Sequence, residues 1–251
     1  MNLTPKERTI VALDVETAEE ALELVSQLQQ LVGMFKVGSQ LFTAAGPKVV
    51  EKIVGGGNKV FLDLKFHDIP HQVTNAVRSA TQLGVSMLTV HASGGREMMR
   101  RAAVSASETA TREGIAPPSV VAVTMLTSID SSVLDEIGIT SSVADMVGRL
   151  ASLAASAGVN GVVASPREIS AVRAAVPDAS FLIVTPGIRP EFEETEDWST
   201  SDDQKRVASP AFALAAGADY LVIGRPITAA RDRAAAARGI ATEIQLRATA
   251  T

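Results

Sequence analysis

Short apolar runs alternate along the chain with longer stretches in which apolar residues recur every three or four positions. A short continuous apolar run is typical of a strand covered on both faces, and the longer spacing is typical of an amphipathic helix. The pattern predicts eight strands, at residues 9–14, 34–37, 59–65, 87–91, 120–124, 161–164, 181–185 and 220–224. It predicts helices at residues 17–31, 39–54, 69–83, 96–112, 130–137, 141–157, 166–175 and 205–216, and an alanine-rich helix after the last strand.

This succession of strand-then-helix units indicates the fold class. Each connection between consecutive strands is long enough for a right-handed crossover, which joins parallel strands. Eight such units favour a closed (β/α)8 TIM barrel, an α/β fold, over an open doubly wound sheet. The chain has 251 residues, a common length for one barrel, and contains no linker or low-complexity segment. The sequence therefore predicts a single domain over residues 1–251.

The composition excludes several kinds of function. The chain has no cysteine, so it has no disulfide, no thiolate metal site and no cysteine nucleophile. Its net charge of −5 disfavours nucleic acid as a partner, because nucleic-acid binders usually carry a basic surface. The polar start is unlike a secretory signal, and no uncharged apolar run reaches the roughly 18 residues that span a bilayer. We therefore expect a cytoplasmic protein with no membrane partner.

Polar side chains stand at the ends of several predicted strands, although a strand covered on both faces is expected to be apolar. Asp14 ends the first strand, Lys36 lies in the second, and Asp63 and Lys65 close the third. In a barrel, the carboxyl ends of all strands share one rim, and that rim holds the active site. We therefore expect these four residues to meet in space. Any one of them alone is equally well explained as an ordinary solvated strand end.

The third strand carries the most specific signal. Asp63 and Lys65 are two positions apart, and alternate strand residues point to the same face, so the carboxylate and the ammonium are expected side by side. Asp68 follows in the next turn and completes an Asp-x-Lys-x-x-Asp pattern. Such charges often form a plain salt bridge. At the end of a barrel strand, however, the pattern favours a catalytic array.

The end of the eighth strand favours a phosphate site. Gly224 lets a backbone N–H approach an anion closely, and Arg225 is expected to begin the last helix, whose N-terminus attracts negative charge. The loops after strands seven and eight are the usual phosphate position in barrels, and Arg189 adds a cation from the first of them. That loop, about residues 187–205, is long and polar, which is typical of a lid; its Gln204 would bring an amide to the phosphate. A helix start with a solvated arginine is the simpler alternative.

No metal site is predicted. His67, His71 and His91 do not share the spacing of metal ligands on one element, and we expect each to have a structural, hydrogen-bonding role. The acidic residues of the polar loop are expected to form a solvated face rather than a metal site.

Seven short motifs are spread over essentially the whole chain: VALD at 11–14, FKVG at 35–38, DLKFHDIP at 63–70, VTMLTS at 123–128, TPGIR at 185–189, DQKR at 203–206 and GRPIT at 224–228. Together and in this order, they resemble the bacterial orotidine 5′-monophosphate decarboxylase family. The combination is highly specific, although each motif alone is not. The resemblance implies a homodimeric barrel that converts orotidine 5′-monophosphate to UMP and CO2 without a metal or an organic cofactor.

The resemblance also assigns roles to individual positions. It implies that Lys65 is the proton donor, between Asp63 and Asp68, and that Asp68 reaches across the dimer into the partner's site. Gln72 stands where the family commonly has a threonine that reaches the same neighbouring site. The further substrate-binding positions that it implies are Asp14 and Lys36 at the ribose and in the charge array, Ile69, Thr127 at the pyrimidine, and Arg189, Gln204, Gly224 and Arg225 at the phosphate.

Two other interpretations stay open from the sequence. The first is a related sugar-phosphate decarboxylase or aldolase on the same barrel, which uses Mg²⁺ and carries a similar Asp-x-Lys-x-x-Asp pattern. The polar loop with Gln204 favours the nucleotide enzyme. The second is a phosphate-binding barrel without catalytic activity, against which the intact lysine–aspartate array argues.

Overall fold

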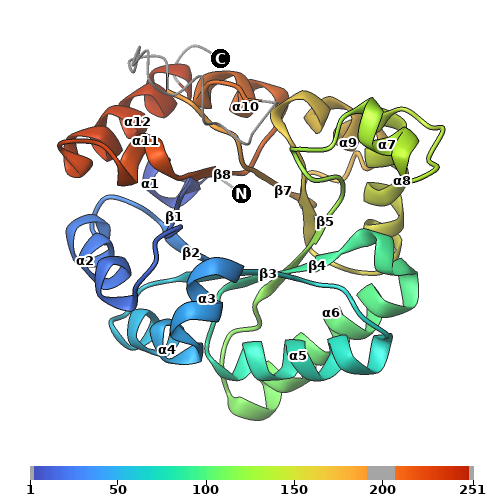
Figure 1. The fold of residues 1–251 in the computed structure, drawn as a ribbon, viewed down its shortest axis with the longest axis horizontal. Coiled ribbons are helices and arrows are strands. Elements are labelled where there is room, and N and C mark those ends of the chain that lie inside the picture. Colours follow the sequence, from blue (N-terminus) through green and yellow to red (C-terminus); the bar gives the residue numbers. More distant parts are fainter. Residues whose placement is uncertain (1–2, 191–206, 249–251) are drawn as a thin grey trace.

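The computed structural model describes residues 3–190 and 207–248, and its eight parallel strands close into a barrel in chain order. The helices form a ring around this barrel (Figure 1). The predicted α/β fold class, a (β/α)8 TIM barrel, is confirmed. The strands are β1 (Thr9–Ala12), β2 (Met34–Gly38), β3 (Val60–Phe66), β4 (Met87–His91), β5 (Ser119–Val123), β6 (Gly161–Val163), β7 (Leu182–Thr185) and β8 (Tyr220–Ile223).

The helices surround the barrel, and most of them connect consecutive strands. Most of them lie where the sequence pattern predicts a helix. They are α1 (Pro5–Arg8), α2 (Ala18–Leu28), α3 (Ser39–Ala45), α4 (Pro47–Gly55), α5 (Pro70–Gln82), α6 (Gly95–Glu113), α7 (Ser131–Glu136), α8 (Val143–Ser156), α9 (Ile169–Ala175), α10 (Pro210–Ala216), α11 (Arg225–Thr228) and α12 (Arg233–Ala248), with short 3-10 turns η1 (Ala92–Gly94) and η2 (Pro166–Glu168). Within the described ranges, no helix is long and apolar enough to cross a membrane.

Two helix predictions need correction. The single helix expected at 39–54 is two helices, because Gly46 adopts a left-handed φ of +66° and Pro47 has no N–H to continue the backbone ladder. Arg225 does not begin the last helix. It begins the four-residue helix α11, and α12 follows from Arg233.

A small apolar cluster fills the interior of the barrel, and all of its members are strand residues. Its buried members are Ile10, Ala12, Met34, Phe61, Met87, Val121, Val184 and Val222. The neighbouring strand residues point outward into a larger core shared with the helices, as Val11, Phe35 and Leu62 do. This alternation fixes which strand residues face the axis of the barrel.

The charged residues at the mouth continue the inward-facing series. Asp14, Lys36 and Asp63 each come two positions after a member of the interior cluster. Their side chains therefore lie on top of an apolar floor, at the end of the barrel where the strands finish.

Candidate active site

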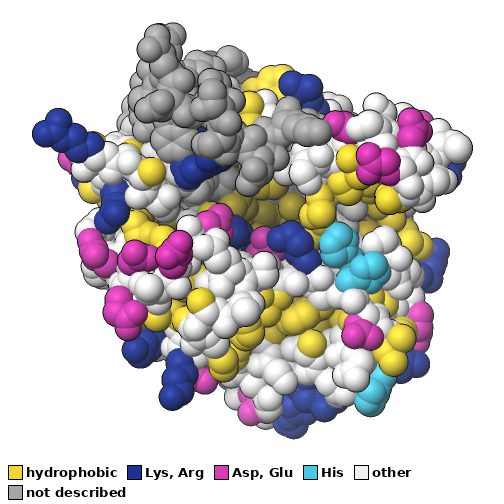
Figure 2. Space-filling view, viewed as in Figure 1, with side chains coloured by type: hydrophobic (Ala, Val, Ile, Leu, Met, Phe, Trp, Pro, Cys, Tyr) yellow, Lys and Arg dark blue, Asp and Glu magenta, His cyan; other side chains and the backbone are white. Residues whose placement is uncertain are grey.

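A cavity of about 520 Å³ opens at the carboxyl ends of the strands. In the space-filling view, lysine or arginine side chains and acidic side chains lie together at this mouth, next to histidine side chains (Figure 2). Eight residues that the sequence predicts as site residues line the cavity: Asp14, Lys36, Asp63, Lys65, Thr127, Arg189, Gly224 and Arg225. The sequence-distant charges therefore do converge.

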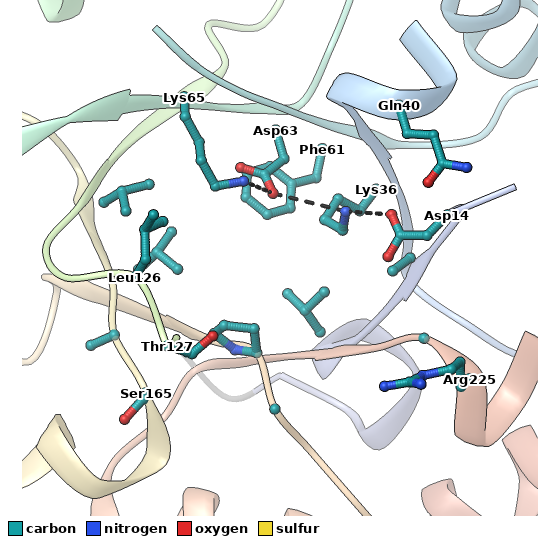
Figure 3. A pocket seen from close by; sticks show the side chains of 18 of the residues that line it. Asp14, Lys36, Gln40, Phe61, Asp63, Lys65, Leu126, Thr127, Ser165 and Arg225 are labelled. Carbon is teal, nitrogen blue, oxygen red and sulfur yellow. Dashed lines mark hydrogen bonds and ion pairs between the residues drawn. The ribbon is translucent and has the colours of Figure 1, made fainter. Parts of the chain in front are cut away.

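Four of these side chains form a chain of alternating charges along one side of the cavity (Figure 3). The Lys36 ammonium Nζ lies 2.9 Å from Asp14 Oδ1 and 3.8 Å from Asp63 Oδ2. The Lys65 Nζ lies 2.8 Å from the same Asp63 oxygen. Asp63 and Lys36 are 12% exposed, whereas Lys65 is 39% exposed. The two central groups are thus held inside the array, and Lys65 keeps an open side toward the cavity.

The register of the first three strands builds this array. Lys36 pairs with Ala12 of β1, and Gly38 at the end of β2 pairs with Asp63 of β3. A Cβ atom at position 38 would lie 3.0 Å from Lys36 Nζ and 3.5 Å from Asp14 Oδ1. The missing side chain at Gly38 therefore leaves room for the ion pair between Lys36 and Asp14.

Lys65 reaches Asp63 through an irregular backbone rather than through simple alternation. Its φ is +52°, and among the described residues it is the one non-glycine residue with a positive φ. The left-handed conformation costs an L-residue about 1–2 kcal/mol. The pairing of β3 with β4 also shifts register between Leu62 and Phe66. The predicted contact between Asp63 and Lys65 is confirmed, but a strand bulge contributes to it.

The opposite side of the cavity carries the residues predicted for phosphate. Gly224 caps α11, Arg225 is its first residue, and both line the cavity together with Gly187 and Arg189 from the loop after β7. Arg225 lies across the cavity from Lys65 (Figure 3). Arg189 Nη1 donates a 2.9 Å hydrogen bond to the Ile188 carbonyl. Cations at two separated ends of one cavity suit a ligand that carries two anionic groups.

The remaining predicted residues are Gln204, Asp68, Ile69 and Gln72. Gln204 falls outside the described residues, as does most of the predicted lid. Asp68, Ile69 and Gln72 are exposed and are not among the residues that line this chain's cavity. The Asp68 carboxylate accepts a 2.6 Å hydrogen bond from the Ile69 N–H, and within the described chain no ion pair joins Asp68 to Lys65.

Comparison with known proteins identifies the family. The sequence model of the orotidine 5′-phosphate decarboxylase/HUMPS family matches residues 7–240. The chain is 51% identical to the orotidine 5′-phosphate decarboxylase of Heliobacterium modesticaldum, over 95% of this chain and 96% of the relative. The chain belongs to the orotidine 5′-phosphate decarboxylase/HUMPS family. The Moorella thermoacetica member is also 51% identical, over 96% of this chain and 93% of the relative.

Solved structures agree with this assignment. The crystal structure of the family member from Lactobacillus acidophilus, an orotidine 5′-phosphate decarboxylase, superposes with a TM-score of 0.82 at 38% identity. The match covers 94% of this chain and 98% of that one. The fold described here is therefore similar to that of a solved family member.

Sequence reasoning missed two polar residues that line this cavity, Gln40 and Ser165. Gln40 lines the cavity from the first turn of α3, on the same side as Asp14 (Figure 3). Ser165 lines it after β6, and its hydroxyl donates to the buried Glu168 carboxylate. A usable signal exists for both, since each is a polar residue close behind a predicted strand. Neither stands in a charge pattern, so nothing singled it out.

Two of the histidines, His67 and His91, lie beside the charge array. The rings of His67 and His91 are 5.2 Å apart and tilted by 32°. Burial lowers the pKa of His91, and the nearby His67 and Lys65 lower it further, whereas Asp63 raises it. His71 lies on α5, where its Nε2 is 3.1 Å from the Asn75 side-chain amide. Within the described ranges, no group of three or more His, Cys, Asp or Glu residues is placed to hold a metal ion.

Proposed function

We propose that this protein decarboxylates orotidine 5′-monophosphate to UMP and CO2, the last step of UMP biosynthesis, at the mouth of its barrel. The observation that carries the proposal is the alternating array from Asp14 to Lys65, with the Lys65 ammonium open to the cavity. The family, and the names of relatives that are about half identical over nearly the whole chain, support the same activity. The protein is then a carboxy-lyase that acts on a nucleotide.

Lys65 performs the chemical step in this proposal. When the bond between the pyrimidine ring and the carboxylate breaks, CO2 leaves and the electron pair stays on the ring carbon. Two unit charges about 4 Å apart interact by roughly 4 kcal/mol at an effective dielectric of 20. A fixed ammonium beside that carbon therefore lowers the free energy of the transition state. Lys65 then gives a proton from Nζ to the carbon, and solvent restores the ammonium.

Asp63 keeps this ammonium in place. Asp63 Oδ2 accepts the hydrogen bond of Lys65 at 2.8 Å, which orients Nζ. Asp63 is only 12% exposed, so its charge stays close to the reacting groups rather than in open solvent. The same negative charge beside the substrate carboxylate would raise the free energy of the bound substrate. In this proposal that effect is secondary to the stabilisation of the transition state by the Lys65 ammonium.

The rest of the nucleotide occupies the other parts of the cavity. Asp14 and Lys36 hold the ribose hydroxyls, and Thr127 contacts the pyrimidine. Arg189, Gln204, Gly224 and Arg225 bind the phosphate. The phosphate lies far from the reacting carbon, and the free energy of its binding helps to hold the substrate against the charge array.

A homodimer completes the site in this proposal. Asp68 is exposed, and Ile69 beside it is 65% exposed although it is a large apolar residue. We infer that the partner subunit covers this loop and that Asp68, Ile69 and Gln72 enter the partner's cavity. The dimer, the single domain over 1–251, the lid and the cytoplasmic location stay predictions.

Mixing two inactive variants tests the dimer. In a hybrid of Lys65→Ala and Asp68→Ala chains, one of the two sites has its own Lys65 together with Asp68 of the other chain. If Asp68 acts across the dimer, mixing under conditions that exchange subunits restores up to about a quarter of wild-type activity. This is because about half of the dimers are hybrids, and each hybrid has one intact site of two. If mixing restores nothing although hybrids form, Asp68 acts within its own chain.

The activity itself is tested by following the ultraviolet absorbance change as orotidine 5′-monophosphate is consumed. Turnover that persists in EDTA supports the proposal. The family also includes the HUMPS group, and the alternative on the same barrel is a Mg²⁺-dependent sugar-phosphate enzyme. Activity on a sugar phosphate that EDTA abolishes would favour that alternative. No turnover of either substrate, with retained phosphate binding, would favour a barrel without catalytic activity.

A further inference from the structure

Thr89 lies behind the charge array, in the middle of β4. Its side chain is fully buried, between the apolar residues Leu88 and Val90. Strand β3 pairs with β4 at Leu62 opposite Leu88, and next at Phe66 opposite Val90. The three β3 residues from Asp63 to Lys65 therefore face the single residue Thr89. A buried hydroxyl stands where the sheet has to accommodate a bulge.

The Thr89 hydroxyl bonds two groups of the array at once. The Lys65 backbone N–H donates to Thr89 Oγ1 at 2.8 Å, and Oγ1 donates to Asp63 Oδ1 at 3.0 Å. The directions are fixed by chemistry, because an amide N–H can only donate and a carboxylate can only accept. The one hydroxyl proton is thus directed to Asp63, and an oxygen lone pair receives the amide of Lys65.

We propose that Thr89 is a positioning residue for the decarboxylation, an inference that rests on the proposed role of Lys65. Its hydroxyl takes the place of a strand partner for the Lys65 N–H, which is displaced from the regular ladder by the bulge. It thereby holds Lys65 in its left-handed conformation at φ +52°. It also occupies Asp63 Oδ1, so that Oδ2 is left for the ammonium groups of Lys65 and Lys36.

This arrangement requires a hydroxyl, not merely a side chain of the right size. Valine has nearly the shape of threonine and fills the same space, but it can neither donate nor accept. With valine, the Lys65 N–H loses its partner and the Asp63 carboxylate is free to turn. Serine retains the hydroxyl and loses only a methyl group. The pair of substitutions therefore separates hydrogen bonding from packing.

The experiment compares Thr89→Val, Thr89→Ser and Thr81→Val for orotidine 5′-monophosphate turnover, affinity for UMP and melting temperature. Thr81 is a matched control, because it is fully buried and its hydroxyl donates to Val77 within α5, away from the cavity. We expect kcat of Thr89→Val to fall by about 10- to 100-fold, the cost of misplacing a catalytic group by about 1 Å. We expect its UMP affinity to change by less than about threefold, because UMP lacks the departing carboxylate.

Serine rescue and the control complete the test. Thr89→Ser is expected to retain kcat within about threefold of wild type, and Thr81→Val is expected to match wild type. Equal kcat for Thr89→Val and wild type overturns the positioning role. So does a loss of kcat in Thr89→Ser as large as in Thr89→Val, which would indicate packing.

The failure of this inference is distinguishable from failure of the proposed function. If the wild-type protein does not turn over orotidine 5′-monophosphate, the proposed function fails whatever Thr89 does. If Lys65→Ala turns over normally, the proposed role of Lys65 fails, and the positioning role that rests on it fails too. If Lys65→Ala is inactive and Thr89→Val is fully active, only the positioning role fails. Should Thr89→Val not fold, amide hydrogen exchange in the wild-type protein decides: protection of the Lys65 N–H is expected, and exchange at the rate of an open amide overturns the proposal.

Discussion

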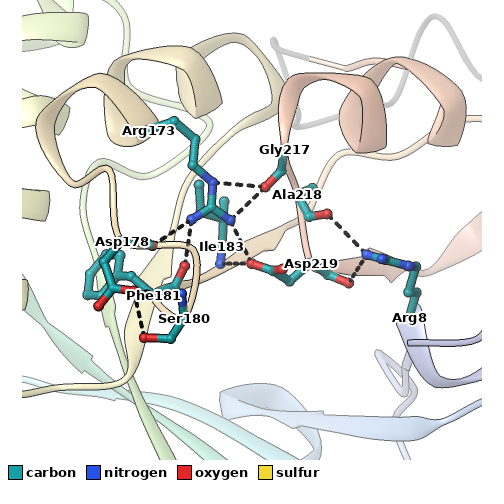
Figure 4. A network of polar contacts seen from close by, with 9 residues as sticks. All are labelled: Arg8, Arg173, Asp178, Ser180, Phe181, Ile183, Gly217, Ala218 and Asp219. Carbon is teal, nitrogen blue, oxygen red and sulfur yellow. Dashed lines mark hydrogen bonds and ion pairs between the residues drawn. The ribbon is translucent and has the colours of Figure 1, made fainter. Parts of the chain in front are cut away.

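The two ends of this barrel carry two charge networks that differ in how their charges are satisfied. At the carboxyl ends of the strands, ammonium and carboxylate groups bond mainly to one another, from Asp14 through to Lys65. At the amino ends of β7 and β8, Arg173 and Asp219 form the centre of a second network (Figure 4). The first network lines a cavity, and the second joins segments of backbone.

The charged groups of the second network form hydrogen bonds mainly with backbone groups. Arg173 donates to the carbonyls of Gly217 and Phe181, at 2.8 Å and 2.7 Å, as well as to the Asp219 carboxylate at 2.8 Å. The same Asp219 oxygen accepts the Ile183 N–H at 2.8 Å. This network therefore fixes α9 to the starts of β7 and β8.

The difference indicates which network serves chemistry. Arginine donors that are used on backbone carbonyls have little capacity left for a ligand, and their energy goes into the fold. Lys65 donates to a single carboxylate and is 39% exposed, so it has ammonium protons to offer the cavity. We expect damage to the mouth to reduce activity and damage to the opposite end to reduce stability.

Removal of the Lys65 ammonium is expected to have the largest effect of the substitutions that test this comparison. We expect Lys65→Ala to lower kcat by at least about 10⁴-fold, because the substitution removes both a general acid and a transition-state charge. UMP binding is expected to remain measurable, because the residues that we propose bind the phosphate and the ribose are untouched. The measurement is ultraviolet turnover with calorimetric titration of UMP.

Lys59 provides the matched control for this substitution. It is an exposed lysine just before the start of β3, at the opposite end of the barrel. Lys59→Ala should keep wild-type kcat. Wild-type-like turnover in Lys65→Ala would rule out the proposed proton donor.

Breaking the second network is expected to cost stability alone. Arg173→Met keeps the aliphatic stem but leaves carbonyls and the Asp219 carboxylate without their donor. Because the two side chains are 24% and 21% exposed, solvent compensates in part, and we expect a loss of about 2 kcal/mol in the free energy of unfolding. That corresponds to a melting temperature lower by about 4–8 °C. At 25 °C, kcat should stay at the wild-type value.

A surface ion pair gives the contrast for this prediction. Arg112→Met removes a partner of Glu113, a pair whose side chains are 54% and 38% exposed. Such pairs contribute about 0–1 kcal/mol, so the effect should be much smaller. Equal stability losses in the two variants would contradict the structural role of the Arg173 network.

The side of the mouth that we propose binds the phosphate allows a third test, because its groups stand on loops and on the short helix α11 rather than on strands. We expect Arg225→Ala to weaken UMP binding by about 10- to 100-fold, the range for a hydrogen bond to a charged group. Arg231, an exposed arginine shortly after α11, is the control. An unchanged UMP dissociation constant in Arg225→Ala would place the phosphate elsewhere.

The strand half of the mouth was more predictable than the loop half. Asp63 and Lys36 could be identified because a charge inside an apolar strand conflicts with burial, and the barrel brings strand ends together. Gln204 belongs to the long polar segment that the sequence predicts as a loop, and no local pattern specifies the course of such a segment. Gln40 stands in the first turn of α3, where no charge pattern marks it as a site residue.

The bulge shows a different limit. The alternation of Asp63 and Lys65 predicts the right pair, yet the left-handed φ of Lys65 depends on Thr89, which lies 26 positions after Asp63. A polar residue inside the apolar run of β4 is a signal that sequence reading could have used. The contact of Thr89 with Asp63 and Lys65 could not be predicted, because this contact results from pairing between β3 and β4 and from a shift in their register.

The smallest expected effect concerns pH and separates the two networks once more. Burial, followed by the charges of His67 and Lys65, lowers the pKa of His91 in the folded protein, and Asp63 opposes this shift. Below about pH 6.5, the ordinary pKa of histidine, the unfolded chain therefore binds more protons than the folded one. The contribution of His91 to the free energy of unfolding is therefore fully present above about pH 6.5, and it is lost as the pH falls through the lower pKa of His91 in the folded protein.

We therefore expect the free energy of unfolding, measured with urea, to fall more between pH 7.5 and pH 5.5 in the wild type than in His91→Gln. The difference between these two losses should be smaller than the loss of free energy of unfolding caused by Arg173→Met. His71→Gln, which alters an exposed histidine on α5, should lose as much as the wild type. Arginine does not titrate in this range, so the deficit of Arg173→Met should be the same at both pH values. An equal loss in the wild type and His91→Gln would show that His91 does not couple protonation at the mouth to folding.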